Sequence, residues 1–157
     1  MSEQRPETQL RQPFNNAPRQ QWMGVMARAK SAELDAILQS QTLPTYDVLK
    51  APETGSVMVE GRAGGTGARF NLGEATVTRC VVRIEGGAMG HAYALGRDKR
   101  KAEIAALLDA MLQGAPPGGA LHDLIACLSM KQAALRATAS RKAAATTGEF
   151  FTLVRGE

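Results

Sequence analysis

A glycine-rich stretch, GRAGGTGARF at residues 61–70, is the part of the sequence whose composition comes nearest to a phosphate-binding loop. A phosphate loop of the Walker type follows a strand, ends in Gly-Lys-Ser/Thr and opens a helix whose N-terminus faces the phosphates. Here the loop ends in Gly-Ala-Arg-Phe, β-like sequence follows it, and the glycine spacing does not fit a dinucleotide-binding fingerprint. We therefore interpret the stretch as a wide hairpin connection whose glycines adopt positive φ angles.

Histidines and cysteines offer little further chemistry. His91, His122, Cys80 and Cys127 have no metal-ligand spacing relative to one another. We interpret the histidines as structural, one on a strand face and one near a helix start, and the cysteines as free and mostly buried thiols. The acidic residues of the predicted helices are interpreted as solvated: Glu33, Asp35, Glu103 and Asp109. The sequence therefore assigns no catalytic residue and no metal ligand.

Basic residues are concentrated in one region of the chain. The net charge is +4 and the sequence pI is about 9.4, but residues 62–101 alone carry eight cations and three acids, a net charge of +5. Lys99, Arg100 and Lys101 fall in the first turn of a predicted helix, where the helix dipole disfavours cations. This arrangement indicates either a solvated basic helix start or a site for an anion.

We expect the glycine-rich loop and residues 96–99 to meet at one end of a sheet and to bind an anion there. The anion is either a substrate triphosphate or a group of carboxylates on a partner. The candidate residues are Arg62, Gly64, Gly65, Thr66, Gly67, Arg69, Arg97 and Lys99.

The elements that must carry these residues follow from the periodicity of the sequence. Residues 1–18 are rich in Gln, Asn and Pro and are expected to form a mobile N-terminal arm, whereas residues 19–157 are expected to form a single domain. Apolar spacing between 19 and 41 predicts helices, with Ser31 as a cap. Short β-like runs between 45 and 95 predict an antiparallel meander with a turn at 51–55.

Helices are predicted again from Asp98, which is a good N-cap, and from about Leu121. The fold class is therefore α+β: an antiparallel β-meander with helices packed on one face. The C-terminal run EFFTLVRGE is short, apolar and β-like. Its apolar side chains are candidates for a partner interface or, alternatively, for an edge strand of the chain's own sheet. They are Phe150, Phe151, Leu153 and Val154.

Composition argues against several functional classes. No apolar run is long enough to span a bilayer and residues 1–20 lack a signal-peptide core, so we expect a soluble, cytoplasmic protein with no membrane partner. Binding of single-stranded nucleic acid needs aromatic side chains among the cations, and only Phe70 and Tyr93 lie in the basic region. We therefore expect no nucleic-acid partner.

Five stretches in order carry a family resemblance: RQQWMGVMARA, ETGSVMVEGRAGGTGARF, GEATVTRCVVR, GRDK with the helix after it, and FFTLVRG. With these stretches, residues 19–157 resemble the PhnG component of the bacterial carbon–phosphorus lyase system. The resemblance implies a role in phosphonate catabolism, inside a multisubunit core complex.

The resemblance also implies a reaction for that complex. It is a transferase, α-D-ribose 1-methylphosphonate 5-triphosphate synthase, which displaces adenine from ATP with methylphosphonate. The other lyase subunits would be the partners, ATP and an alkylphosphonate would be substrates of the complex, and this chain would bind no cofactor and be inactive alone. The family assigns no catalytic residue to this subunit. Two other interpretations stay open: a non-catalytic assembly subunit, and a basic module that binds single-stranded nucleic acid.

Overall fold

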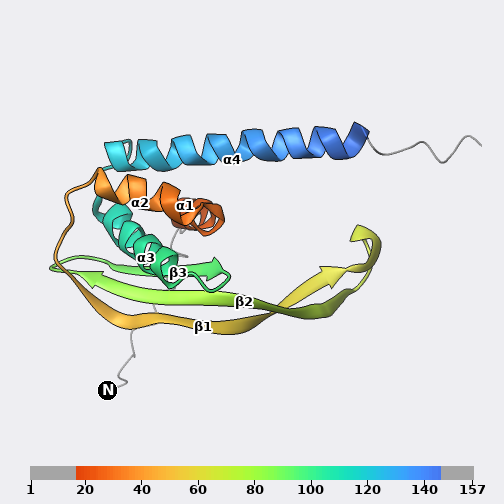
Figure 1. The fold of residues 1–157 in the computed structure, drawn as a ribbon, viewed down its shortest axis with the longest axis horizontal. Coiled ribbons are helices and arrows are strands. Elements are labelled where there is room, and N and C mark those ends of the chain that lie inside the picture. Colours follow the sequence, from red (N-terminus) through yellow and green to blue (C-terminus); the bar gives the residue numbers. More distant parts are fainter. Residues whose placement is uncertain (1–16, 146–157) are drawn as a thin grey trace, which may run out of the picture.

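Four helices and three strands make up the part of the chain that the computed structural model describes, residues 17–145. They follow one another as α1 (Ala17–Arg28), α2 (Ser31–Gln39), β1 (Tyr46–Arg62), β2 (Arg69–Ile84), β3 (Met89–Leu95), α3 (Lys99–Gly114) and α4 (Ala120–Ala145). The strands form one antiparallel sheet in the order β1-β2-β3. The helices lie on one face of this sheet, with α4 farthest from it (Figure 1). The predicted α+β meander with helices on one face is confirmed.

The core lies between β2, β3 and α3. Thr78, Cys80 and Val82 of β2 are buried, whereas the alternate residues Arg79 and Arg83 are exposed, as expected for a strand with one covered face. Almost every residue of α3 from Ala102 to Leu112 is buried. Because α3 is covered on all sides, it is the central helix of the fold.

Gly90 of β3 marks the closest approach between the sheet and α3. A Cβ atom built on Gly90 would lie 1.8 Å from the backbone oxygen of Ala106. The α3 backbone therefore rests directly on the β3 backbone, and only glycine fits at this position.

The predicted turn at residues 51–55 is wrong, because β1 is one continuous strand of 17 residues. The pairing of β1 with β2 shifts between Val48 and Lys50 and again between Lys50 and Glu53. Pro52 falls inside the second irregularity, on a strand at the edge of the sheet. A proline is tolerated there because no neighbouring strand needs its missing N–H. Turn-forming residues thus occupy β-bulges rather than a chain reversal.

The helix starts agree with the sequence for α3 and for α4, which begins at Ala120, and differ for α1 and α2. Asp98 caps α3 by accepting a hydrogen bond from the backbone N of Lys101 at 2.9 Å, as predicted. Ser31 is not a cap: the N-cap of α2 is Lys30, whose backbone N–H donates to the Glu33 carboxylate at 3.0 Å. Helix α1 begins at Ala17, two residues inside the predicted N-terminal arm, and residues 1–16 lie outside the described residues. The mobile arm stays a prediction.

A two-stranded extension continues the sheet beyond its third strand. β3 pairs with β2 only from Val77, opposite Leu95, to Arg83, opposite Met89. β1 and β2 run on together to the pair Arg62 and Arg69 and project away from the body of the protein (Figure 1). We call this extension, residues 56–76, the β-ribbon. At its tip lies the glycine-rich hairpin connection.

The tip of the β-ribbon has the geometry expected from the glycines. Gly64 and Gly65 adopt φ angles of 60° and 78° in a short 3₁₀ turn, Ala63–Gly65. The prediction of a wide hairpin connection between two strands is confirmed.

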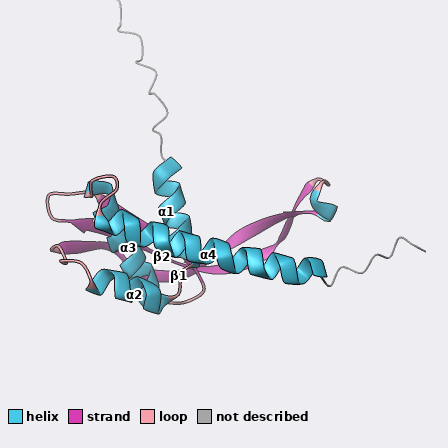
Figure 2. Ribbon diagram, turned by 90° about the horizontal axis from the view of Figure 1, so that it is seen from above, coloured by secondary structure: helices cyan, strands magenta, loops and turns pink. Residues whose placement is uncertain are grey.

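Helix α4 also leaves the body. Its buried residues, Leu121, Ile125 and Leu128, all lie in its first half. Beyond Leu128 the helix continues to Ala145 with no buried residue and extends past the other helices (Figure 2). Between residues 17 and 145, no helix is long and apolar enough to cross a membrane.

Candidate functional site

The predicted shared anion site does not form, because its two halves lie far apart. Residues 96–99 follow β3, which ends opposite Val77, whereas Arg69 pairs with Arg62 at the tip of the β-ribbon. The stretch of β2 between Arg69 and Val77 spans roughly 26 Å at a strand rise of about 3.3 Å per residue. That part of the prediction is wrong, since β1 and β2 extend beyond β3. Whether either half binds an anion by itself stays a prediction.

The three cations in the first turn of α3 have different environments. Arg100 donates to the Asp35 carboxylate of α2 at 3.1 Å. Lys101 donates from Nζ to the backbone oxygen of Ala27, near the end of α1, at 2.7 Å. Burial lowers the pKa of Lys101. These two residues therefore tie the first two helices to α3, which gives a structural reason for cations at this unfavourable end of a helix.

The remaining cations of the prediction lie at the surface. Arg97 and Lys99 lie at the base of α3, where Lys99 is exposed and Arg97 precedes the capping residue. Arg69 lies 3.8 Å from the Glu60 carboxylate across the β-ribbon. Their side chains are accessible to an anionic partner, and none of them lines the pocket of about 620 Å³ between α1 and α4 or the one of about 220 Å³ between α1 and β3.

Asp109 is the acidic residue that sequence reasoning placed wrongly. It was interpreted as solvated, yet its side chain is fully buried in the centre of α3. Arg19 donates to its carboxylate at 2.7 and 3.2 Å, Trp22 donates from Nε1 at 2.8 Å, and the backbone N of His91 donates at 2.9 Å. One carboxylate thus joins α1, α3 and β3. The sequence feature that indicates its burial is its position between Leu108 and Ala110 in an apolar run.

The other three acidic residues are at least partly covered, and each has a partner. Tyr46 donates to Glu103 at 2.9 Å. Glu33 and Asp35 of α2 pair with Lys131 of α4 and Arg100 of α3, respectively. All three act as surface ties between elements.

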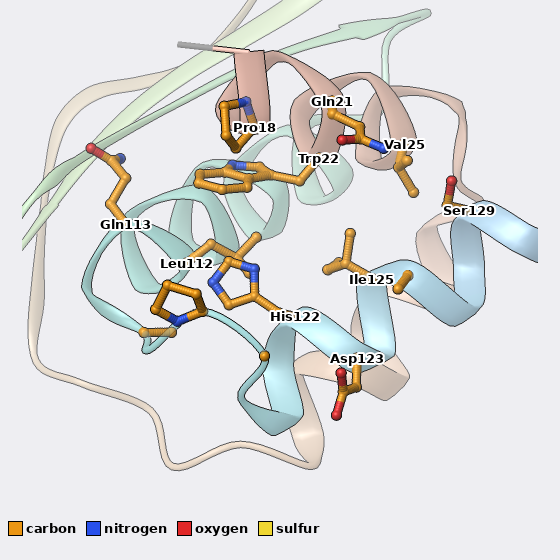
Figure 3. Close-up of a pocket in the computed structure, with 14 residues that line it drawn as sticks. Pro18, Gln21, Trp22, Val25, Leu112, Gln113, His122, Asp123, Ile125 and Ser129 are labelled. Atoms are coloured by element: carbon orange, nitrogen blue, oxygen red, sulfur yellow. The ribbon is translucent and has the colours of Figure 1, made fainter. Parts of the chain in front are cut away.

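A pocket of about 620 Å³ opens beside this network, between α1, the α3–α4 connection and the start of α4 (Figure 3). Trp22, Val25, Leu112 and Ile125 form its apolar walls. His122 contacts Trp22 edge to face, with 5.5 Å between the ring centroids. Sequence reasoning did not find this pocket, because its walls come from three separate segments.

The pocket is suited to an apolar or aromatic group and not to a polyphosphate. Among its lining residues are His122 and Asp123 but no lysine or arginine. Phosphate oxygens are held by cations, by several backbone N–H groups or by a bound metal. Within residues 17–145, no group of three or more His, Cys, Asp and Glu side chains could hold a metal ion.

The two thiols differ more than predicted. Both are free, but Cys80 is buried and Cys127 is exposed, so the expectation of mostly buried thiols is wrong for Cys127. Cys80 donates to the backbone oxygen of Lys50 at 3.4 Å, and burial raises the pKa of its thiol. A buried thiol with a raised pKa is a poor nucleophile.

The apolar C-terminal candidates, Phe150, Phe151, Leu153 and Val154, lie outside the described residues.

Comparison with known proteins identifies the family. The family described as "Phosphonate metabolism protein PhnG" matches residues 17–156. A protein of Rhizobium meliloti (strain 1021), named "Alpha-D-ribose 1-methylphosphonate 5-triphosphate synthase subunit PhnG", is 45% identical over 151 residues, which cover 90% of this chain and 91% of the relative. The matched region begins at the first residue of α1 and takes in the whole described fold. This chain belongs to the PhnG family of phosphonate metabolism proteins.

Proposed function

We propose that this chain is a subunit of an α-D-ribose 1-methylphosphonate 5-triphosphate synthase and that it acts only together with partner subunits. The observation that carries the proposal is the 45% identity, along nine tenths of both chains, to a relative that bears this name. Identity of this extent along both chains supports a shared fold and a shared place in such a complex.

The reaction of the complex is the displacement of adenine from ATP by methylphosphonate, as the family resemblance implies. ATP is then a substrate of the complex, and this chain binds no cofactor of its own. The chemistry of the described residues supports this division of labour. Asp109 and Arg19, the most deeply placed charged pair, bind each other, and the larger pocket has no cation for a triphosphate.

Reconstitution from separately purified subunits tests the proposal. Adenine release from ATP and methylphosphonate is measured by chromatography for this chain alone, for the other subunits without it, and for the full set. We expect release only from the full set. Robust release by this chain alone would overturn the accessory role, and full activity of the other subunits without it would overturn its membership of the synthase.

An assembly role without contact to substrate is the second candidate. It is favoured by the two elements that leave the body, the β-ribbon and the second half of α4, because neither is covered in the described structure. The two roles separate in the reconstituted enzyme: an assembly subunit changes the amount of active complex, whereas a substrate-binding subunit also changes the concentration of ATP needed for half-maximal rate.

A further inference from the structure

The β-ribbon is exposed to an extent that is unusual for paired strands. From residue 53 to residue 74 every residue is exposed except Gly61 and Gly67, which are partly covered. Beyond Val77 only two strands are present, since β3 ends there. An isolated pair of strands is only marginally stable in water and is normally stabilised by packing one face on another element.

The two faces of the β-ribbon differ in chemistry. Side chains alternate along a strand, so Val57 and Val59 lie on the same face as Gly61. A Cβ atom built on Gly61 would lie 3.8 Å from the Leu72 side chain and 3.9 Å from that of Phe70, so both side chains belong to this face as well. All four apolar side chains are exposed. We call Val57, Val59, Phe70 and Leu72 the apolar ribbon face.

The opposite face carries the charged side chains of the β-ribbon. Alternation places Met58, Glu60 and Arg62 of β1 there, and Arg69 reaches across to Glu60 at 3.8 Å. Glu74, opposite Met58, lies on the same side. The β-ribbon is therefore amphipathic, as is typical of antiparallel strands that pack one face against protein and expose the other to solvent.

A bulge gives one residue of the apolar face a special position. The register shifts between Val59, which pairs with Gly73, and Glu60, which pairs with Asn71, so Leu72 has no cross-strand partner. Bulges of this kind redirect a side chain. Leu72 is the most exposed of the large apolar residues of the β-ribbon, at 66%.

We propose that the apolar ribbon face is the surface on which another subunit of the synthase docks, through an apolar groove that receives Leu72 and Phe70. This inference rests on the proposed function, because it takes the occupant to be a synthase subunit. Val57, Val59, Phe70 and Leu72 are apolar and exposed, and the charged residues of the β-ribbon lie on its other face. The apolar ribbon face therefore resembles the centre of a protein interface, where charged residues are depleted. The projecting position lets the β-ribbon reach a partner that the body does not touch (Figure 1).

A pair of matched substitutions tests this surface. Leu72→Asp places a charge in the apolar ribbon face, whereas Met58→Asp places the same charge on the opposite face at a similar exposure, 55%. Each variant of the full chain is titrated against the remaining synthase subunits, and its melting temperature is recorded alone. We expect Leu72→Asp to weaken binding at least tenfold and Met58→Asp to change it less than twofold, with both melting temperatures near that of the wild type.

The measurements also distinguish other occupants. Binding like that of the wild type by a Phe70→Asp, Leu72→Asp double variant would overturn the proposal. A marked fall in melting temperature with unchanged binding would show that another part of this chain covers the face, and dissociation of a wild-type homodimer by Leu72→Asp would show a second copy there; either result overturns it. If the wild-type chain does not bind the other subunits at all, the proposed function itself fails.

Hydrogen exchange gives an independent readout on the unmodified chain. Backbone amides of residues 56–76 should exchange more slowly in the complex than in the free chain. Protection confined to the body, with the β-ribbon unchanged, would contradict docking at this face.

Discussion

Nη2 of Arg19 lies 2.7 Å from Oδ2 of Asp109, although ninety residues separate the two in the chain. The carboxylate is fully buried, while the arginine side chain keeps 30% of its surface exposed. The ion pair thus joins α1 to the central helix α3 through a carboxylate that is inaccessible to water.

Replacing Asp109 should therefore be costly. Asp109→Ala removes the acceptor of the hydrogen bonds from Arg19, Trp22 and the backbone N–H of His91. Breaking a buried charged pair in this way typically costs about 3–5 kcal/mol. We expect the free energy of unfolding, measured by urea titration, to fall by about that amount. Asp123→Ala, an exposed residue of α4, is the control and should change it by less than about 0.5 kcal/mol. Equal effects of both variants would contradict the anchoring role of Asp109.

Gly90→Ala should separate α3 from β3. The added methyl carbon would meet the Ala106 oxygen at 1.8 Å, so the helix must move away from the strand. Overpacking of a core costs about 1–3 kcal/mol and occasionally more, and we expect a loss at the upper end of this range in thermal unfolding. Gly55→Ala is a matched control, since its Cβ would meet nothing within 4 Å. A Gly90→Ala variant as stable as Gly55→Ala would refute the close contact.

The Glu33–Lys131 pair should make a small contribution to stability that depends on pH. The Lys131 side chain, and then the backbone N–H of Lys30, hold the pKa of Glu33 below its usual 4.5. The ionised Glu33 carboxylate therefore stabilises the fold fully above about pH 4.5. This stabilisation is lost as the pH falls through the lowered pKa of Glu33 in the folded protein. Glu33→Gln should cost less than about 1 kcal/mol near pH 7, as for other surface pairs, and nothing at lower pH. A difference between the two proteins that is constant from pH 7 to pH 3 would contradict this assignment.

Arg97 and Lys99 are expected to meet carboxylates of a partner rather than a triphosphate. Both are exposed, and neither lines the pocket of about 620 Å³ or the one of about 220 Å³. The double variant Arg97→Ala, Lys99→Ala should weaken assembly of the synthase, and the difference from wild type should shrink as salt rises, because salt screens exposed charges. A raised ATP requirement with unchanged assembly would instead identify a phosphate site. Wild-type behaviour in both assays would show that these cations are only solvated.

Deleting residues 149–157 should abolish assembly of the complex while leaving the helical content nearly unchanged. The deleted segment contains the apolar run FFTLV, and α4, which precedes it, ends at Ala145. Circular dichroism reports the helical content, and copurification with the other subunits reports assembly. A truncated chain that still copurifies would place the interface elsewhere.

Local sequence patterns are sufficient to predict those helices and strands that have one buried face and one exposed face. The alternation along β2 and the cap at Asp98 are properties of neighbouring residues, so periodicity and turn chemistry predict them. Pro52 misled the prediction because turn residues and bulge residues have the same composition, and only pairing with β2 separates them.

The candidate site could not be assembled from sequence in the same way. How far β1 and β2 continue beyond β3 depends on register, which no local pattern specifies, and this extension separates Arg69 from Arg97. The burial of Asp109 depends on Arg19, a partner ninety residues away. The amphipathic character of the β-ribbon is visible in sequence only once its strands are paired and Leu72 is recognised as a bulge.

The contrast between the two thiols gives the chain a natural attachment point for a spectroscopic label. Cys80 is buried and its pKa is raised, whereas Cys127 is exposed on α4, directly before Leu128, the last buried residue of that helix. A maleimide dye should therefore react with Cys127 alone, without any engineered cysteine. Attached where α4 leaves the body, the dye would change its fluorescence when a neighbouring subunit covers the free half of the helix, so complex formation could be followed in real time with the native sequence.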